Sequence, residues 1–523
     1  MALVTLHNIK KSFGDRLLFE MDHLSIHKGD RIGLVGTNGS GKTTLLNIIS
    51  GEIEPDEGSI ESHALISFLP QLKEKSQTKS GGEVTADYVI QALNEKSQLL
   101  LADEPTTHLD MRHIEWVEKA FQKYSGAFIV ISHDRTFLDN VCDTIWELDN
   151  NKIKRYSGNY ASYKKEKDNE RQFQQTEYEK YIKKSKQLQE AKEKKAKQAN
   201  NAVKRKAPVG DSEYNLKGAS DYFQSKAKKL HSVQKSMETR LEKLEKVDKP
   251  KDTQTVKMEL PEMEAIQNRF IIRGFDLEGK VPGKRLWKPT NISVKGGEKV
   301  GIIGPNGSGK TTLIQNILSE RDKLTLSPAM KIGYFSQNLT ILDTDKSILE
   351  NVSEEAVQSE TLTRIVLAQL NFKGEDVFKK VSVLSGGERV KVSLAKLLVG
   401  DYNTLVLDEP TNFLDIQAVE ALENLLKDYE GTLLVVSHDR AFLSSIIDKL
   451  WIIEDKQLNE FNGTYTEWEN TSVSTLVDEV EEELLRIENQ LTTVLSELSL
   501  NPSEEKEREF QELLQQKKTL KST

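Results

Sequence analysis

Cysteine is nearly absent from the sequence, since Cys142 is the only one among 523 residues. A single cysteine excludes an internal disulfide and any zinc site built from cysteines, so we expect Cys142 to be buried packing. Long apolar runs are also missing. The longest, such as Ala127–Ile131, have the length of a buried strand, whereas a membrane-spanning helix needs about 20 mostly apolar residues. The first residues lack the basic stretch and apolar core of a signal peptide, so we expect a cytoplasmic protein with no membrane partner.

The length and composition indicate a protein of more than one domain. The chain is 30% charged and 37% hydrophobic, which is ordinary for a water-exposed globular protein. At roughly 100–200 residues per domain, this length predicts two or three globular units with connectors.

Two segments, residues 36–44 and 304–312, match the pattern of a phosphate-binding loop. Each follows an apolar strand and precedes a helical pattern, as such a loop requires. The glycines let the backbone approach a phosphate, and the helix N-terminus favours negative charge. The lysine suits the outer phosphates and the threonine suits Mg²⁺. The predicted contacts are Gly36, Asn38, Gly39, Ser40, Gly41, Lys42, Thr43, Thr44, Gly304, Asn306, Gly307, Ser308, Gly309, Lys310, Thr311 and Thr312.

An apolar run ends in two acids in each half of the chain, Asp103–Glu104 and Asp408–Glu409. Paired acids at the end of a buried strand are costly without a metal or another partner. The aspartate can hold Mg²⁺ and the glutamate can polarise an attacking water. A histidine follows the next apolar run at the same distance in both halves. We therefore predict that Glu104, Glu409, His133 and His438 are catalytic and that Asp103 and Asp408 bind Mg²⁺.

Further motifs resemble those of ATP-binding-cassette ATPases. Residues 80–83 and 384–388 resemble the family's signature sequence, and Gln71 and Gln337 resemble its Q-loop glutamines. The resemblance implies that two domains close head to tail around two ATP molecules, within one monomeric chain. It also implies that both glutamines contact ATP and Mg²⁺, and that each signature completes the other domain's site. The implied signature contacts are Ser80, Gly81, Gly82, Ser385, Gly386 and Gly387.

The two copies of the motif set differ in length. Ser80 and Ser385 are 305 positions apart, but Lys42 and Lys310 are only 268 apart. The second copy therefore has 37 more residues between its phosphate loop and its signature. The extra residues follow Gln337, where the family carries a small helical subdomain. The first copy has almost no such segment.

Two further positions distinguish the copies. Lys79 stands where the second signature has Leu384, so we expect the site completed by the first signature to behave differently. Phe13 matches the position of the family's adenine-stacking aromatic residue, and we assign it that contact. Val281 stands at the equivalent place in the second copy, where we assign no residue.

The residues after the paired acids narrow the resemblance. Residues 104–110 and 409–415 resemble the Glu-Pro-Thr-Asn-His-Leu-Asp run of the F class of cassette ATPases, with one deviation each, Thr107 and Phe413. That class consists mainly of soluble translation factors and ribosome-protection proteins.

A long polar segment joins the two copies. From about residue 163 to 206 it has good helix formers and neither glycine nor proline, then breaks at residues 207–211 and resumes to about Val247. The 3/4 spacing of apolar residues in the second part is typical of a coiled-coil seam. We predict an antiparallel hairpin whose helices of roughly 30–40 residues extend about 45–60 Å. The predicted seam is Leu230, Val233, Met237, Leu241 and Leu244, facing Phe173, Tyr181 and Leu188.

The charge of this segment indicates its partner. Residues 181–240 carry 16 basic and 6 acidic side chains, a net +10, while the whole chain is −9. Concentrated positive charge is expected beside a polyanion, although a solvated linker remains an alternative. We predict RNA contacts at Lys204, Arg205, Lys206, Val209, Tyr214, Leu216 and Lys217.

The predicted fold class is α/β, with two phosphate-loop ATPase domains in tandem. They occupy residues 1–162 and 256–471 and are joined by the helical-hairpin linker, residues 163–255. An acidic helical extension occupies residues 472–523, with 12 acids and 6 bases.

The whole chain resembles the Vga type of antibiotic-resistance proteins in the F class. This resemblance implies an ATP-dependent protein at the bacterial ribosome's exit-tRNA site, with rRNA, the P-site tRNA and ribosomal proteins as partners. Its linker would reach toward the site of lincosamides, streptogramins A and pleuromutilins, and ATP hydrolysis would drive release. A housekeeping translation or assembly factor of the same class is the alternative. A transporter subunit fits less well, because it should not need the basic hairpin. A DNA-repair ATPase also fits less well, because DNA-organising cassette ATPases usually carry far longer coiled coils or zinc modules, and Cys142 alone excludes cysteine-ligated zinc.

Overall fold

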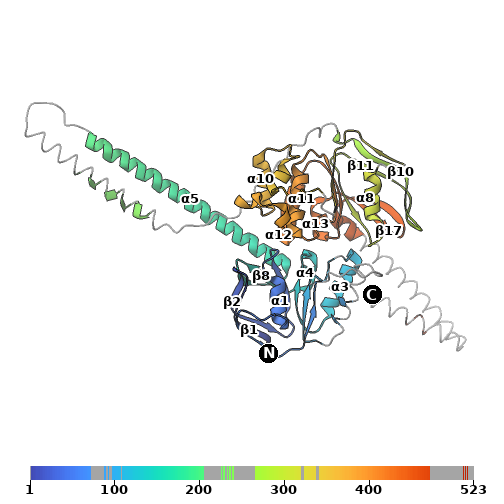
Figure 1. Cartoon of the computed structure of the whole chain (residues 1–523), viewed down its shortest axis with the longest axis horizontal. Helices are drawn as coiled ribbons and strands as arrows, with labels where there is room; N and C mark the ends of the chain where they lie inside the picture. The colour runs from blue at the N-terminus through green and yellow to red at the C-terminus, as the bar shows by residue number, and fades with distance from the viewer. Residues whose placement is uncertain are drawn as a thin grey trace, which may run out of the picture. The chain divides into compact units, whose positions relative to one another are not determined.

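The computed structural model of the chain describes residues 2–71, 88–89, 92–93, 97–107, 109–204, 225, 228–229, 232–233, 235–236, 238–240, 266–319, 323–336, 341–471, 511, 513 and 515. These residues form two compact units (Figure 1). One unit contains Met1–Tyr156 and Thr255–Thr523, and the other is Ser157–Gln254. Among the described residues, no helix has the length and apolar character needed to cross a membrane.

The first unit contains two α/β domains, and the first of these is built on two sheets. A six-stranded sheet has the order β5-β6-β7-β3-β8-β9, and a three-stranded sheet has the order β2-β1-β4. The elements are β1 (Ala2–Phe13), β2 (Arg16–His27), β3 (Arg31–Gly36), α1 (Lys42–Ser50), β4 (Glu57–Ser62), β5 (Ile66–Leu69), β6 (Leu99–Asp103), α3 (Met111–Lys123), β7 (Ala127–Ile131), α4 (Arg135–Val141), β8 (Thr144–Asp149) and β9 (Lys152–Ser157).

The second domain repeats this topology. Its sheets have the orders β14-β15-β16-β12-β17-β18 and β11-β10-β13. The elements are β10 (Phe270–Val281), β11 (Lys284–Lys295), β12 (Lys299–Ile303), α8 (Lys310–Leu318), β13 (Leu324–Leu326), β14 (Ile332–Phe335), α9 (Ile348–Ser353), α10 (Glu360–Gln369), the 3₁₀ turns η1 (Gly374–Phe378) and η2 (Val381–Val383), α11 (Gly386–Val399), β15 (Thr404–Asp408), α12 (Ile416–Asp428), β16 (Thr432–Val436), α13 (Arg440–Ile446), β17 (Lys449–Glu454) and β18 (Gln457–Asn462). The predicted α/β class is confirmed.

The central strands are apolar because the sheets are covered on both faces. Every residue of β6, β7, β15 and β16 is buried, as expected for parallel strands between helical layers. Trp146 and Trp451, which are 305 positions apart, are fully buried in the two cores. The duplication seen in the motifs therefore extends to the packing.

A helical subdomain distinguishes the second domain. Helices α9, α10 and α11 surround a core in which Val352, Val366 and Leu367 are fully buried. It contains most of the 37 extra residues. In the corresponding part of the first domain, residues 88–89 and 92–93 are described; all four are helical, and Val89 and Ala92 are buried.

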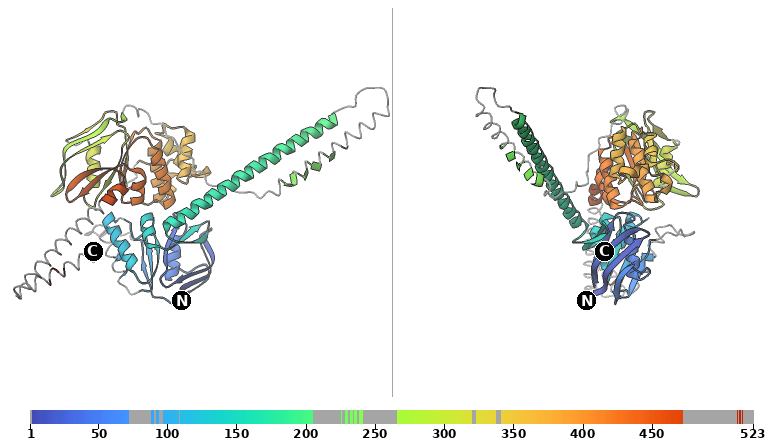
Figure 2. Two further views of the ribbon diagram at one scale, coloured as in Figure 1. Left: turned by 180° about the vertical axis from the view of Figure 1, so that it is seen from behind. Right: turned by 60° about the vertical axis from the view of Figure 1, so that its left-hand side comes forward.

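The second compact unit is dominated by α5 (Tyr160–Lys204), a single helix of 45 residues. Figure 2 shows it unbroken in two views. It begins three residues before the predicted start. Lys192 forms an ion pair of 2.6 Å with Glu238, so the returning segment lies beside α5, as an antiparallel hairpin requires. Tyr181 and Leu188 are partly buried on α5, as predicted for the stripe. Phe173 is 68% exposed and Val233 of the returning segment is 42% exposed, so these two side chains do not form the predicted seam.

Several predicted positions lie outside the described residues. They are Ser80, Gly81, Gly82, Gln337, Arg205, Lys206, Val209, Tyr214, Leu216, Lys217 and the seam residues Leu230, Met237, Leu241 and Leu244, together with most of the acidic extension. Lys204 is described only as the last residue of α5.

Candidate functional site

The motif residues collect at one edge of each six-stranded sheet. In the first domain β6, β7 and β3 are neighbours and run parallel. Strand β3 ends at Gly36, β6 ends at Asp103, and β7 ends just before Ser132. The carboxyl ends of parallel strands meet at one edge, which is where α/β sheets bind ligands. Strands β12, β15 and β16 of the second domain form the same arrangement.

Each phosphate loop wraps its own lysine. Lys42 Nζ donates to the carbonyl oxygens of Gly36 at 2.8 Å and Thr37 at 3.1 Å. Lys310 donates to the carbonyls of the equivalent loop at 2.7 and 3.1 Å. Gly41 and Gly309 cap the following helices with φ of 104° and 109°, a left-handed conformation that glycine adopts without strain. The loop therefore encircles a cation at a helix N-terminus, which is suited to a polyphosphate.

A hydroxyl and a carboxylate meet beside each lysine. Thr43 Oγ1 donates to Asp103 Oδ2 at 2.7 Å, and Thr311 Oγ1 donates to Asp408 Oδ2 at 3.3 Å. Both are hard oxygen ligands, which Mg²⁺ prefers, and Mg²⁺ usually completes its shell with phosphate and water. The residues present therefore fit this ion, even though no group of three or more metal-ligating side chains occurs among the described residues. Gln71 is exposed just after β5.

The predicted catalytic glutamates have an unusual backbone. Glu104 and Glu409 have φ of 54° and 52°, a left-handed conformation that costs a non-glycine residue about 1–3 kcal/mol. Burial, together with the Asp103 carboxylate, raises the pKa of Glu104 to about 8. Burial and Asp408 likewise raise the pKa of Glu409 to about 8. The same strain at both acids indicates that the fold holds each carboxylate in a fixed direction.

A histidine lies against each glutamate. His133 Nε2 is 3.5 Å from Glu104 Oε1, and His438 Nε2 is 3.5 Å from Glu409 Oε1. The backbone N–H of His133 also donates to Glu104 Oε2 at 3.3 Å. Burial, followed by the nearby Lys42, lowers the pKa of His133 to about 3, and burial with Lys310 does the same for His438. Both rings are neutral, so these contacts are polar contacts between neutral groups and not ion pairs.

The second signature faces the first phosphate loop. A Cβ added to Gly387 would lie 2.7 Å from the Phe413 carbonyl oxygen and 3.5 Å from Asn38 Nδ2. Asn38 Nδ2 donates to that same carbonyl at 3.1 Å. We call the phosphate loop, acids and histidine of the first domain site one, and those of the second domain site two. Signature residues of the second domain therefore border site one.

An aspartate from each domain reaches the opposite phosphate loop. Asp415 Oδ2 accepts from the backbone N–H of Asn38 at 3.2 Å, and Asp110 Oδ2 accepts from that of Asn306 at 2.9 Å. Burial raises the pKa of each carboxyl, but their partners hold the pKa of both below the usual value. For Asp110 these partners are Asn306 and His113, and for Asp415 the largest contribution is from Lys391. The two domains are thus joined through both phosphate loops.

The second signature also begins a helix. Ser385 caps α11 and exchanges hydrogen bonds with Glu388 in a capping box. The N-terminus of a helix of 14 residues carries a partial positive charge that favours a phosphate. The matching residues of the first domain, Ser80, Gly81 and Gly82, lie outside the described residues.

The predicted adenine contact of the first domain, Phe13, has no aromatic counterpart in the second domain. Phe13 pairs with Arg16 at the end of the β1–β2 hairpin and is 83% exposed. Val281 pairs with Lys284 at the end of the β10–β11 hairpin, so the structure places it at the position that Phe13 occupies in the first domain. Site one has an aromatic ring there, and site two has a smaller aliphatic side chain.

The residues that join the domains were not predicted from the sequence. Asp110 and Asp415 appeared only as part of a motif, and Arg135 and Arg440 were not considered. Each pair is 305 positions apart and has the same residue type in both copies, so repetition could have marked these residues, although not what they contact.

Paired phosphate loops, acid-ended strands and a facing signature define a tandem ATP-binding-cassette ATPase. The family model described as ABC transporter matches residues 19–71 and 287–412. The chain is 33% identical to the ribosome protection protein VmlR of Bacillus subtilis (strain 168), over 95% of this chain and 93% of that one. It is 31% identical to the erythromycin resistance ATP-binding protein MsrA of Staphylococcus epidermidis, over 87% and 99%.

A solved structure called RNase-L Inhibitor has the same fold, with a TM-score of 0.61 and 18% identity, and the match covers 90% of this chain and 93% of that one. The chain therefore belongs to the ABC-F family of ATP-binding-cassette proteins and is an ATP-hydrolysing enzyme.

Proposed function

We propose that this ATPase protects the bacterial ribosome from antibiotics that bind the peptidyl-transferase centre. One observation carries the proposal: the likeness to a ribosome protection protein spans 95% of the chain, including the linker. The proposed drug classes are lincosamides, streptogramins A and pleuromutilins. The proposed partners are rRNA, the P-site tRNA and ribosomal proteins near the exit-tRNA site.

The charge distribution along α5 supports an RNA partner. Its first twenty residues carry four bases and five acids, whereas its last 25, residues 180–204, carry nine lysines and two glutamates. Net charge thus rises from −1 to +7 along one helix. Repulsion among these lysines disfavours the hairpin by itself, and phosphate groups relieve it by neutralisation and counterion release.

We propose that ATP is held by the two phosphate loops and the two signatures, with Phe13 against the adenine of site one. Mg²⁺, held by Thr43 and Asp103 or by Thr311 and Asp408, with Gln71 or Gln337, would screen the phosphate charge. The charge of this ion beside Asp103 would offset that carboxylate and so lower the pKa of Glu104 toward its ordinary range. Glu104 can then accept a proton from the attacking water, and neutral His133 can donate a hydrogen bond to the outer phosphate.

Closure of the two domains is the proposed switch. Moving a two-state equilibrium from 1:99 to 99:1 takes about 5.5 kcal/mol of differential binding. Hydrogen bonds to a charged phosphate contribute about 1.5–3 kcal/mol each, so a few such bonds per ATP from both domains suffice. The closed form would bind the ribosome, and hydrolysis would release it.

Trapping the closed state tests ribosome binding. The double variant Glu104→Gln with Glu409→Gln should sediment with 70S ribosomes in ATP and remain in the supernatant in ADP. The unmodified chain should sediment weakly in both, because hydrolysis releases it. The proposal fails if the double variant sediments equally in ATP and ADP, or in neither.

Drug tolerance separates protection from a housekeeping role. The unmodified chain, expressed in a drug-sensitive bacterium, should raise the inhibitory concentrations of the three drug classes at least fourfold. An aminoglycoside, which binds elsewhere on the ribosome, serves as the control and should show no change. Ribosome binding without any shift in tolerance would favour the housekeeping factor.

A further inference from the structure

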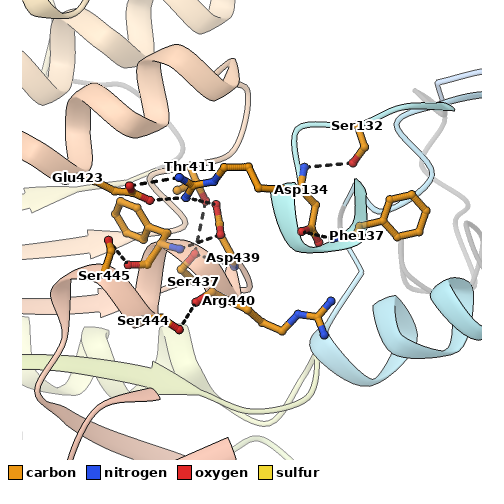
Figure 3. Close-up of polar contacts among 12 residues, drawn as sticks. Ser132, Asp134, Phe137, Thr411, Glu423, Ser437, Asp439, Arg440, Ser444 and Ser445 are labelled. Atoms are coloured by element: carbon orange, nitrogen blue, oxygen red, sulfur yellow. Dashed lines mark hydrogen bonds and ion pairs between the residues drawn. The ribbon is translucent and has the colours of Figure 1, made fainter. Parts of the chain in front are cut away.

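A crossed pair of buried ion pairs joins the two domains close to both ATP sites. Arg135 of the first domain donates to Glu423 of α12 from both terminal guanidinium nitrogens, one of them at 3.2 Å. Arg440 of the second domain binds Glu118 of α3. All four side chains are at most 9% exposed. Figure 3 shows Asp134 of the first domain opposite Glu423 and Asp439 of the second, with Arg440 extending back toward the first.

Each arginine lies two residues after a predicted catalytic histidine and is the first residue of the next helix, α4 or α13. We call residues 132–135 and 437–440 the histidine loops. In the first domain the backbone N–H of His133 donates to Glu104, and Asp134 caps α4 by accepting from Phe137 N at 3.0 Å. Arg135 follows immediately. Three consecutive residues therefore contact the catalytic glutamate, a helix of the same domain and a helix of the other domain. Asp439 and Arg440 repeat this arrangement.

The two histidine loops also approach each other directly. Arg135 lies 3.8 Å from Asp439 Oδ2, across the domain boundary. Burial lowers the pKa of the Arg440 guanidinium, but the negative charges of Asp134 and Glu118 outweigh burial and raise that pKa above its usual value. Asp134 therefore acts on Arg440 across the domain boundary. The loops of site one and site two thus share one buried cluster of ions.

The carboxylates sit on helices that already touch the opposite phosphate loop. Helix α12 begins after Asp415, which accepts from Asn38 N, and carries Glu423 eight residues later. Helix α3 begins after Asp110, which accepts from Asn306 N, and carries Glu118 eight residues later. Eight residues span about 12 Å of helix. One rigid helix from the second domain therefore contacts both the phosphate loop and the histidine loop of site one, and α3 does the same for site two.

The burial of these ion pairs argues against the view that they serve only to hold the two domains together. Removing an arginine and a carboxylate from water costs free energy that offsets most of their attraction, so a buried pair adds little to affinity. It does fix geometry, most tightly at Arg135, whose guanidinium holds Glu423 through two parallel hydrogen bonds. Arg440 holds Glu118 through one.

We propose that Arg135 and Arg440 are positioning residues for ATP hydrolysis. Each holds the histidine loop of its own site in place, using a carboxylate supplied by the other domain. Site one can then hydrolyse ATP only when α12 is in contact with Arg135, and site two only when α3 is in contact with Arg440. This requirement is separate from the contacts that the nucleotide itself makes. The inference concerns the ATPase reaction and does not depend on ribosome binding.

Site-isolated enzymes test this in the full chain. With Glu409→Gln only site one turns over, and with Glu104→Gln only site two does. We expect Arg135→Met to lower kcat at least tenfold in the first background, with KM for ATP changed less than threefold. In the second background it should lower kcat less than threefold, because Arg135 there makes only the longer 3.8 Å contact with Asp439. Arg440→Met should give the reverse pattern. Equal losses in both backgrounds would overturn the proposal, since they would indicate a general weakening of closure.

Three further variants separate positioning from misfolding. Arg135→Lys keeps the charge and should recover part of the lost kcat. Glu423→Gln should reproduce the effect of Arg135→Met, and the double variant should be no worse than either single one, because both break the same contact. Arg112→Ala removes an exposed ion pair with Glu454 across the same interface and should leave kcat within twofold. Additive losses, or an equal loss from Arg112→Ala, would contradict the proposal.

Discussion

Site one and site two share their chemistry and differ in what surrounds it. Both have a lysine held by loop carbonyls, a Thr–Asp hydroxyl–carboxylate pair, and a strained glutamate beside a neutral histidine. Site one adds an aromatic ring at Phe13 and a signature that begins a capped helix in a packed subdomain. Site two has Val281 at the matching position and a signature next to a much shorter segment.

A second difference lies in the aspartates that cross between the domains. Asp415 contacts Lys391 of α11 at 3.4 Å, and that lysine is 7% exposed. Asp110 instead contacts His113 Nδ1 at 2.6 Å, and the His113 side chain is 43% exposed. The position 305 residues before Lys391 is Ala86, which cannot supply a cation. The duplication thus preserved the reacting groups and altered the groups that hold them. The two sites are therefore expected to hydrolyse ATP at different rates.

The largest expected effect comes from removing the predicted general base of each site. Glu104→Gln should lower steady-state phosphate release at least tenfold, while Glu409→Gln lowers it less than twofold, because site one has the more complete surroundings. The double variant should lose at least about 100-fold, in line with the ~10²–10⁴-fold contribution of general-base catalysis. Equal losses from the two single variants would show that the surroundings do not set the rate.

Exchanging the residues at the hairpin ends tests a smaller difference. Phe13→Ala should raise KM for ATP about tenfold when only site one is active, because base–aromatic stacking contributes about 1–3 kcal/mol. Val281→Phe should lower KM when only site two is active. Phe275→Ala removes another exposed aromatic residue of the second domain and should change neither value. Nucleotide affinity is to be measured with a fluorescent ATP analogue alongside the kinetics.

The placement of the parts of the site that are contiguous in the sequence was predicted correctly. The phosphate loops, acid-ended strands and histidine loops are contiguous motifs, and each lies where the strand–loop–helix pattern placed it. The contacts between domains were missed because Arg135 and Glu423 are 288 residues apart, and no short pattern records such a pairing. The left-handed backbone of Glu104 was also not predicted, since nothing in an Asp-Glu-Pro sequence specifies positive φ at a glutamate.

The linker shows the same limit. Its helical character followed from its composition, but periodicity alone placed Phe173 in the seam, and the structure leaves that side chain exposed. A facing residue depends on where the returning segment runs, and the Lys192–Glu238 contact fixes that only in three dimensions.

The smallest expected effect concerns the aspartates. Asp415→Asn keeps an oxygen for Asn38 but leaves Lys391 buried without a carboxylate. Since breaking a buried pair costs several kcal/mol and the asparagine oxygen recovers part of it, we expect a loss of about 2 kcal/mol. At ~2–4 °C per kcal/mol, the unfolding temperature should fall by about 4–8 °C. Asp110→Asn should lower it by no more than about 2 °C, because His113 is partly exposed to water.

The double variant Asp415→Asn with Lys391→Met should recover most of the lost stability, because it removes the buried charge along with its partner. Differential scanning calorimetry in nucleotide-free buffer provides the measurement and excludes a contribution from ATP binding. If Asp110→Asn and Asp415→Asn lowered the unfolding temperature equally, Lys391 would not be the source of the asymmetry. The difference between the sites would then rest on the hairpin ends and the signatures alone.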